Sequence, residues 1–493
     1  MRVPSTIPFG EWLPDLPANG NPGSIVAKNV IPSINSFAGL RSLLPFTNAL
    51  AGACKGLFWM NDKNGNIVNM AGDPLTLYKL DSNGSSWVDV SKAGGYTAGG
   101  YWEFAKFGER VIATNGGDPV QKFDVGTDTA FSDLAGSPPV AKHIAIVRDF
   151  VMLGDIDGKG PNFVQWSGYN NSELWTPDIA TQSDQQQLFG NGGAVQRIVP
   201  GRWATVLLEQ SIYIGRYTGP PTIFQFDEIA VKRGTPSPRS VVWAGSTIWF
   251  FGWDGFYRLD AGSGEPVSIS HNRISRWFAD NSDPTAWEDM VGTVDIPRRL
   301  LIWAFKSSAS AANNDRLLIY NWVADKWATA EVETQFIGEY VPPGVTLDNL
   351  DTFLVNGIDT DSILVDSSAY SGGGLNTMAF AADNTGGTFD GAYLTAELES
   401  SEVSDPGMQR LFLSAVRPLI EGNGSTATTV SVGTRNSLED TPVYTNPKAP
   451  HSASRQVPFR KNARFMRFRV QVTGGFAYAD GVKITVNPAG GER

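Results

Sequence analysis

The sequence of 493 residues contains one cysteine and three histidines. Cys54 alone cannot form an intramolecular disulfide, which excludes a small scaffold held by disulfides and a cysteine-based zinc cluster. A three-histidine metal site would need His143, His271 and His451 together. None of them lies beside a Gly-x-Ser-x-Gly turn or in a helical metal-binding motif. We therefore expect no catalytic residues, no metal and no cofactor, and the chain is predicted not to be an enzyme.

Long apolar runs are also missing. No window offers the roughly 18 uncharged apolar residues that a membrane span needs, and the N-terminus lacks the apolar core of a signal peptide. We expect a soluble product, made in a cytoplasm, with no membrane span. Charged residues make up 18% and hydrophobic residues 41% of the chain, so it should fold rather than stay disordered.

Helical periodicity is scarce, and short apolar runs broken by Gly, Asn, Asp and Pro predict an all-β chain. The Gly-Asp-Pro unit at 72–74 recurs 45 residues later at 117–119. A period in the forties with several short strands per unit is typical of β-propeller blades. Six blades are predicted from hairpins within 57–70, 104–113, 144–153, 206–214, 241–251 and 291–305. Segments 353–355 and 363–365 would form a seventh blade or a closing strand.

Two flanking regions differ from the repeats. Residues 1–45 hold seven prolines and are predicted to form an extended arm over a neighbouring surface. The propeller is expected to span 46–370, followed by a Gly-rich linker or loop at 371–392. Residues 393–493 alternate apolar and polar side chains, which predicts an antiparallel β-sandwich that serves as a docking domain.

Basic residues are absent between Lys326 and Arg410, where fourteen acids occur. One interpretation is an ordinary solvated surface. The other is a wall that repels a polyanion such as duplex DNA, because carboxylates do not bind phosphates. The candidates for lining such a DNA channel are Glu339, Asp348, Asp351, Asp359, Asp361, Asp383 and Asp390.

A basic segment occupies residues 460–469. The strand period places Arg467 and Arg469 on one exposed face, which is either a solvated face with cross-strand pairing or a docking surface. A protein partner is favoured over DNA because the net charge of the chain is −11 and no aromatic on that face could stack on bases. The candidates for protein docking are Arg460, Lys461, Arg464, Arg467 and Arg469.

Both ends of the chain carry motifs that are structural rather than catalytic. At the N-terminus these are FGEWLPD at 9–15, NPG at 21–23 and AKNVIP at 27–32; at the C-terminus they are VRPL at 416–419, VGTR at 432–435 and ARFMRFRV at 463–470. They resemble the ends of tail nozzle proteins of short-tailed bacteriophages (podoviruses), also called tail hub or packaged-DNA stabilisation proteins.

The resemblance implies a structural virion protein located in the viral tail. Its subunits would assemble as a ring, expected to be a hexamer, at the distal end of the tail. The implied partners are the head–tail adaptor and the tail fibres or spikes, and double-stranded DNA would pass through the lumen and be held there until ejection.

Two alternatives stay open. One is a propeller tail component that binds or hydrolyses host surface glycans, which would require aromatics and paired carboxylates facing one pocket. The other is an unrelated propeller scaffold.

Overall fold

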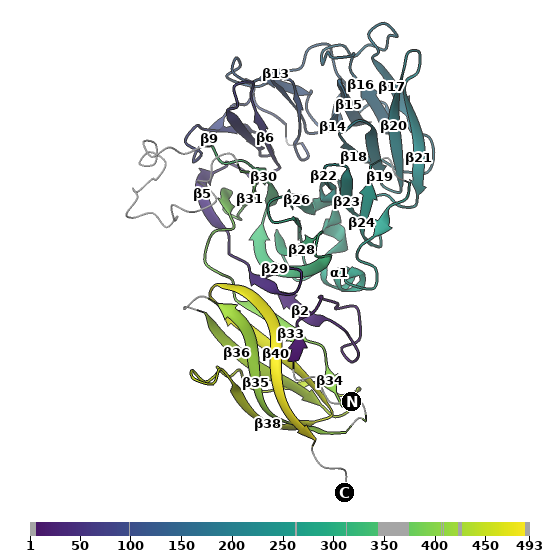
Figure 1. Cartoon of the computed structure of the whole chain (residues 1–493). Coiled ribbons are helices and arrows are strands. Elements are labelled where there is room, and N and C mark those ends of the chain that lie inside the picture. The colour runs from purple at the N-terminus through teal and green to yellow at the C-terminus, as the bar shows by residue number, and fades with distance from the viewer. Residues whose placement is uncertain are drawn as a thin grey trace.

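The computed structural model describes residues 6–97, 99–261, 264–311, 313–343, 374–405, 407, 409–422 and 426–488. Figure 1 shows a propeller joined to a smaller β-domain that contains the C-terminal strands. In these ranges the regular structure is strand except for α1 (Ser275–Asn281) and the short 3₁₀ helices η1 (Pro238–Ser240) and η2 (Pro284–Asp289). The all-β prediction is therefore confirmed.

Seven four-stranded antiparallel units form the described part of the propeller. The first blade contains β6 (Gly56–Asn61), β7 (Ile67–Gly72), β8 (Leu77–Leu80) and β9 (Trp87–Asp89). The second contains β10 (Glu103–Phe107), β11 (Arg110–Thr114), β12 (Gln121–Asp124) and β13 (Ser132–Asp133). The third contains β14 (Ala141–Val147), β15 (Phe150–Ile156), β16 (Gly160–Trp166) and β17 (Asp184–Gln187). The fourth contains β18 (Val195–Val199), β19 (Ala204–Leu208), β20 (Ser211–Gly219) and β21 (Ile223–Val231).

The remaining blades complete the ring. The fifth contains β22 (Val242–Ala244), β23 (Thr247–Gly252), β24 (Gly255–Asp260) and β25 (Val267–Ser268). The sixth contains β26 (Val291–Asp295), β27 (Leu300–Phe305), β28 (Asn314–Asn321) and β29 (Lys326–Thr334). The seventh contains β30 (Phe336–Tyr340), β31 (Asn376–Phe380), β32 (Thr385–Thr388) and, from the N-terminal region, β5 (Leu44–Ala49). Because β30 contacts both β26 and β6, the seventh blade connects the sixth blade to the first.

The seventh blade corrects the predicted linker at 371–392. Its described part, from residue 374 onward, holds β31 and β32, and β5 pairs antiparallel with β32. Glycine occurs in β32 because the backbone of β5 passes very close to it: a Cβ at Gly387 would lie 2.5 Å from the carbonyl oxygen of Leu44. Glycine within a strand here marks close backbone approach rather than a flexible connection. The predicted segments 353–355 and 363–365 lie outside the described residues.

The second domain is the predicted sandwich, but it contains the N-terminal arm as well. One sheet has the order β3 (Val30–Pro32), β4 (Phe37–Gly39), β40 (Phe476–Pro488), β35 (Leu411–Gly422) and β38 (Val457–Ala463), with β1 (Thr6–Pro8) also paired to β40. The other sheet has the order β2 (Ser24–Lys28), β33 (Ala396–Ser400), β39 (Phe465–Thr473), β36 (Ala427–Arg435) and β37 (Val443–Tyr444), with β34 (Val403–Ser404) on β39. The arm is extended, as predicted, and it pairs within its own chain.

The arm also joins the two domains. Strand β2 pairs with β33 of the sandwich and, in parallel, with β29 of the sixth blade, so that one ten-stranded sheet runs through both domains. Asn29 follows β2 with a φ of 58°, a conformation that asparagine tolerates better than most residues. Its N–H donates to the carbonyl of Thr329, its amide donates to Thr395 and its amide oxygen accepts from the N–H of Glu331. One side chain thus ties the arm to both domains.

Candidate functional site

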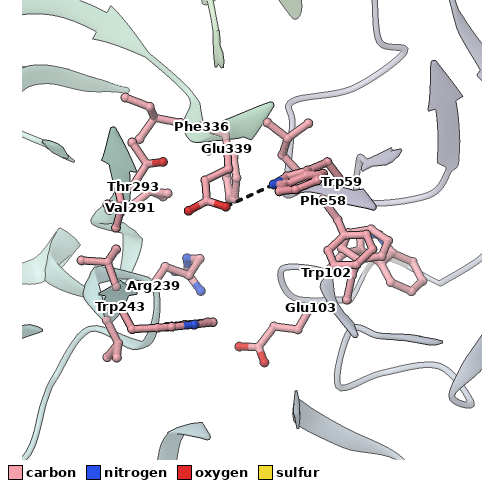
Figure 2. A pocket seen from close by; sticks show the side chains of 18 of the residues that line it. Phe58, Trp59, Trp102, Glu103, Arg239, Trp243, Val291, Thr293, Phe336 and Glu339 are labelled. Atoms are coloured by element: carbon pink, nitrogen blue, oxygen red, sulfur yellow. Dashed lines mark hydrogen bonds between the residues drawn. The ribbon is translucent and has the colours of Figure 1, made fainter. Parts of the chain in front are cut away.

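The first strands of the blades surround a cavity of about 390 Å³ inside the propeller, called here the axial cavity. Residues of β6, β10, β18, β22, β26 and β30 line it, so most blades contribute. Figure 2 shows tryptophans, two carboxylates and a guanidinium group projecting into the same space. The charged, hydroxyl and tryptophan side chains of the lining are Trp59, Trp102, Glu103, Arg197, Arg239, Trp243, Thr293 and Glu339.

Glu103 is the most constrained of these groups. It is 7% exposed, and its carboxylate lies 2.8 Å from Nδ1 of His143 and 2.5 Å from a guanidinium nitrogen of Arg197. The N–H of Ile144 donates to its other oxygen. Burial raises the pKa of Glu103, but the charges of Arg197 and His143 and these hydrogen bonds outweigh it and bring the pKa to about 2. This ionised group connects the second, third and fourth blades.

Glu339 has the opposite character. Its carboxylate accepts a hydrogen bond of 3.2 Å from the indole N–H of Trp59 (Figure 2). Burial raises the pKa of Glu339, and this single hydrogen bond lowers it by less. The axial cavity therefore holds two carboxyl groups whose pKa values are moved in opposite directions.

Arg239 lies between the axial cavity and a neighbouring cavity of about 300 Å³, since it lines both, as does Glu103. Its guanidinium carbon is 3.3 Å from the ring centroid of Tyr101, and the side chain is 12% exposed. Its nearest carboxylate is that of Asp289, at 3.6 Å, and it donates to the carbonyl of Glu288. Burial lowers the pKa of Arg239. A second cation, Lys55, lies 4.1 Å from the same tyrosine ring.

Sequence reasoning missed this cavity because its residues come from six blades and form no local motif. The repeat did hold a signal. Trp59 and Glu103 lie 44 residues apart and Thr293 and Glu339 lie 46 apart, close to the blade period. Polar or aromatic residues that recur at this period on the first strand of each blade must face a common axis.

The predicted channel-lining residues do not come together in the described structure. Glu339 lies on the first strand of the seventh blade and faces the axial cavity. Asp383 is exposed in the turn between β31 and β32, where its carboxylate accepts from Thr385. Asp390 follows β32, and its carboxylate accepts from Thr388. Four further candidates lie outside the described residues: Asp348, Asp351, Asp359 and Asp361.

Several acids of the 327–409 segment are paired with bases from distant parts of the chain. Glu331 on β29 lies 2.5 Å from Nζ of Lys28 on β2 and 2.6 Å from a guanidinium nitrogen of Arg316 on β28. Within the described residues, part of this acid-only sequence is therefore locally neutralised. At Glu331, the run of one charge sign along the sequence therefore does not give a surface of that sign.

The predicted docking residues divide into two groups. Arg460 and Lys461 are exposed on β38, which pairs with β35 at the edge of its sheet. Charged side chains at such an edge hinder pairing with other strands. Arg464 is half-buried just after β38. The first two remain candidates for contact with a partner.

Arg467 and Arg469 were predicted to lie on one exposed face, used either for cross-strand pairing or for docking. Both are half-buried rather than exposed, and the cross-strand pairing is present. Nε of Arg469 lies 2.7 Å from Glu399, whose side chain is 1% exposed, and its guanidinium stacks 4.2 Å from the ring centroid of Tyr444. Arg467 lies 3.5 Å from Glu399 and 3.4 Å from Glu402. The strand period correctly placed Arg467 and Arg469 on the same face. It could not show that β33, an acidic strand from a distant part of the sequence, pairs with β39 beside them.

Charge reversal should separate these two groups. Arg460→Glu with Lys461→Glu is expected to change the free energy of unfolding by less than about 0.5 kcal/mol, as for other surface substitutions. Arg467→Glu is expected to lower it by about 3–5 kcal/mol, because it leaves Glu399 and Glu402 buried beside a like charge. Urea unfolding measures both. Equal losses of stability would contradict this division into exposed and half-buried residues. If the losses differ as expected, Arg460 and Lys461 are the pair whose charge reversal can test docking in a folded protein.

Comparisons with known proteins give no family for this chain. No family model and no curated protein matches it. Among solved structures, BamB from Moraxella catarrhalis is 12% identical with a TM-score of 0.31, covering 61% of this chain and 92% of that one. A chain of the Mitotic Checkpoint Complex is 10% identical with a TM-score of 0.38, covering 73% and 95%. The extracellular domain of a one-component system from B. thetaiotaomicron is 9% identical with a TM-score of 0.42, covering 94% and 62%.

The described residues lack two features. None of their helices is long and apolar enough to cross a membrane. None of their His, Cys, Asp and Glu side chains cluster in threes at a spacing that could hold a metal ion.

Proposed function

We propose that this protein is a structural subunit of a short bacteriophage tail. Its copies would form the distal ring, or nozzle, which docks the adaptor and the fibres or spikes and retains the packaged DNA until ejection. In this proposal the chain performs no reaction. The support is the resemblance at both ends of the sequence together with the structural role of the residues that carry it.

The N-terminal motif residues hold the two domains together, and this observation carries the proposal. Phe9 and Trp12 are 0% and 2% exposed, and they belong to one hydrophobic core with Trp303 of the sixth blade and Val470 of the sandwich. Gly23 has no space for a side chain, since a Cβ there would lie 1.9 Å from the carbonyl oxygen of Glu11. These residues specify how the propeller and the sandwich are joined.

The C-terminal motifs have a similar role. Val416 and Val432, from the two sheets of the sandwich, are fully buried. A Cβ at Gly433 would lie 2.8 Å from the ring of Tyr444, so the tyrosine can pack there only over glycine. Motifs that encode a fixed two-domain body suit a subunit that must hold its shape under load.

The test is the composition and shape of the virion. Mass spectrometry of purified particles is expected to find this chain at about six copies, as a closed hexameric ring requires. Electron microscopy of the isolated tail or protein should show an annulus, and host glycans incubated with the protein should release no reducing ends. Absence from the particle, or a strictly monomeric protein at all concentrations, would contradict the proposal.

A second function is favoured by the axial cavity. A propeller that binds or hydrolyses surface glycans needs aromatics and paired carboxylates in one pocket, and Trp59, Trp102, Glu103 and Glu339 meet there. Sugars pack their apolar faces on aromatic rings, and glycoside hydrolysis uses two carboxyl groups of different pKa. We therefore keep glycan binding or hydrolysis as a second proposal, which would show itself by release of reducing ends.

A further inference from the structure

We infer that the axial cavity binds a small ligand carrying a carboxylate, with the chemistry of a hexuronic acid. The inference rests on the second proposed function, for which it names the substrate class. It does not depend on the proposed ring, because a tail subunit could assemble into the ring whether or not its axial cavity binds such a sugar.

The first step is the set of donors without acceptors. Nε of Arg239, Nε of Arg197 and Oγ1 of Thr293 are buried and have no hydrogen-bond partner among the described residues. All three side chains line the axial cavity. A buried donor left unpaired costs free energy, so several in one place indicate a group that would satisfy them. Two guanidinium N–H groups and a hydroxyl are suited to the oxygens of a carboxylate.

The second step is the local charge. The charge of Arg197 is balanced by Glu103, at 2.5 Å. Arg239 has only a looser pairing with Asp289, at 3.6 Å, while Lys55 shares the ring of Tyr101 with it. The carboxylates of Asp289, Glu288 and Glu103 all act on the charge of Arg239, but only that of Asp289 lies within 4 Å of its guanidinium group, so Arg239 has no close ion-pair partner among the described residues. An anionic group placed beside Arg239 would offset its charge.

The third step is the shape and apolar character of the walls. Trp59 and Trp243 line the cavity, and Figure 2 shows both around the space that Arg239 faces. Trp102 also borders the cavity, but its ring is 4% exposed and packs against Tyr96 in the core. A volume of about 390 Å³ falls within the roughly 300–1,000 Å³ of small-molecule sites. A bare inorganic anion would leave these apolar walls without contact. A sugar ring on the indoles with its carboxylate on the arginines would use both features, and Glu339 could hydrogen-bond its hydroxyls.

Isothermal titration calorimetry of the full-length protein tests this with D-glucuronate, D-glucose and inorganic sulfate as probes. Glucuronate is expected to bind at least about tenfold more tightly than glucose or sulfate, since only it satisfies both the donors and the aromatic walls. Equal affinities for glucuronate and glucose would overturn the inference. So would tighter binding of sulfate, or no binding of glucuronate at about 50 mM, well above the millimolar range of weak sites.

Variants locate the site. Arg239→Lys keeps the charge but lacks the Nε donor and should weaken glucuronate binding about tenfold, and Thr293→Val should weaken it about threefold by removing one hydroxyl donor. Arg276→Lys, whose side chain is 82% exposed on α1, is the control and should bind normally. Unchanged affinity in both cavity variants would overturn the inference. If Arg239→Lys does not fold, the affinity of Thr293→Val for glucuronate decides the question. The proposed ring is tested separately, by the composition of the virion.

Discussion

Deletion of residues 1–50 is expected to unfold both domains of the protein. The deletion removes β5, the last strand of the seventh blade, and leaves β32 as an open edge. It also removes β1 to β4 from the two sheets of the sandwich. The buried side chains lost include Phe9, Trp12 and Phe37. Each contributes about 2 kcal/mol or more by burial, against a total stability of about 5–15 kcal/mol.

Far-UV circular dichroism and urea unfolding of the truncated chain measure this effect, and a cooperative transition at the midpoint of the full-length protein would contradict it. A peptide of residues 1–50 added in trans is the matched control. Because this segment pairs through strands, as in other strand-addition complexes, it should restore native circular dichroism. A peptide with Trp12→Ala and Phe37→Ala should restore much less.

The blades could be predicted from the sequence because each is made of neighbouring strands. The hairpins expected at 104–113 and 144–153 are β10–β11 and β14–β15. The seventh blade could not be predicted in the same way. Its strand β5 pairs with β32, which lies over 300 residues later, and such long-range pairing leaves no local pattern. For the same reason, pairing of the arm within its own chain could not be predicted.

A second limit of prediction from sequence concerns what packs against a given face of a strand. Hydrophobic alternation indicates which residues of a strand share a face, but it does not say what lies opposite them. Arg467 alternates like a surface residue, yet its face is covered by Glu399 and Glu402. Glu103 and Arg197 are 94 residues apart and were not singled out, since an ion pair that closes inside a ring of blades is specified only by the closed ring.

Replacement of Glu103 by Gln is expected to lower the free energy of unfolding at pH 7 by about 3–5 kcal/mol, because it leaves the charge of Arg197 buried without its partner. The pKa of Glu103 is about 2 in the folded protein, against an ordinary value of 4.5. Its ion pairs therefore stabilise the fold above pH 4.5, and this contribution is lost as the pH falls through 2. The difference between wild type and variant should therefore shrink by about 2 kcal/mol between pH 7 and pH 3, measured by urea unfolding at both. Glu173→Gln, which removes the surface partner of Arg110, should cost less than about 1 kcal/mol at pH 7. A loss at Glu103 that is the same at both pH values would show that the carboxylate acts by shape rather than by charge.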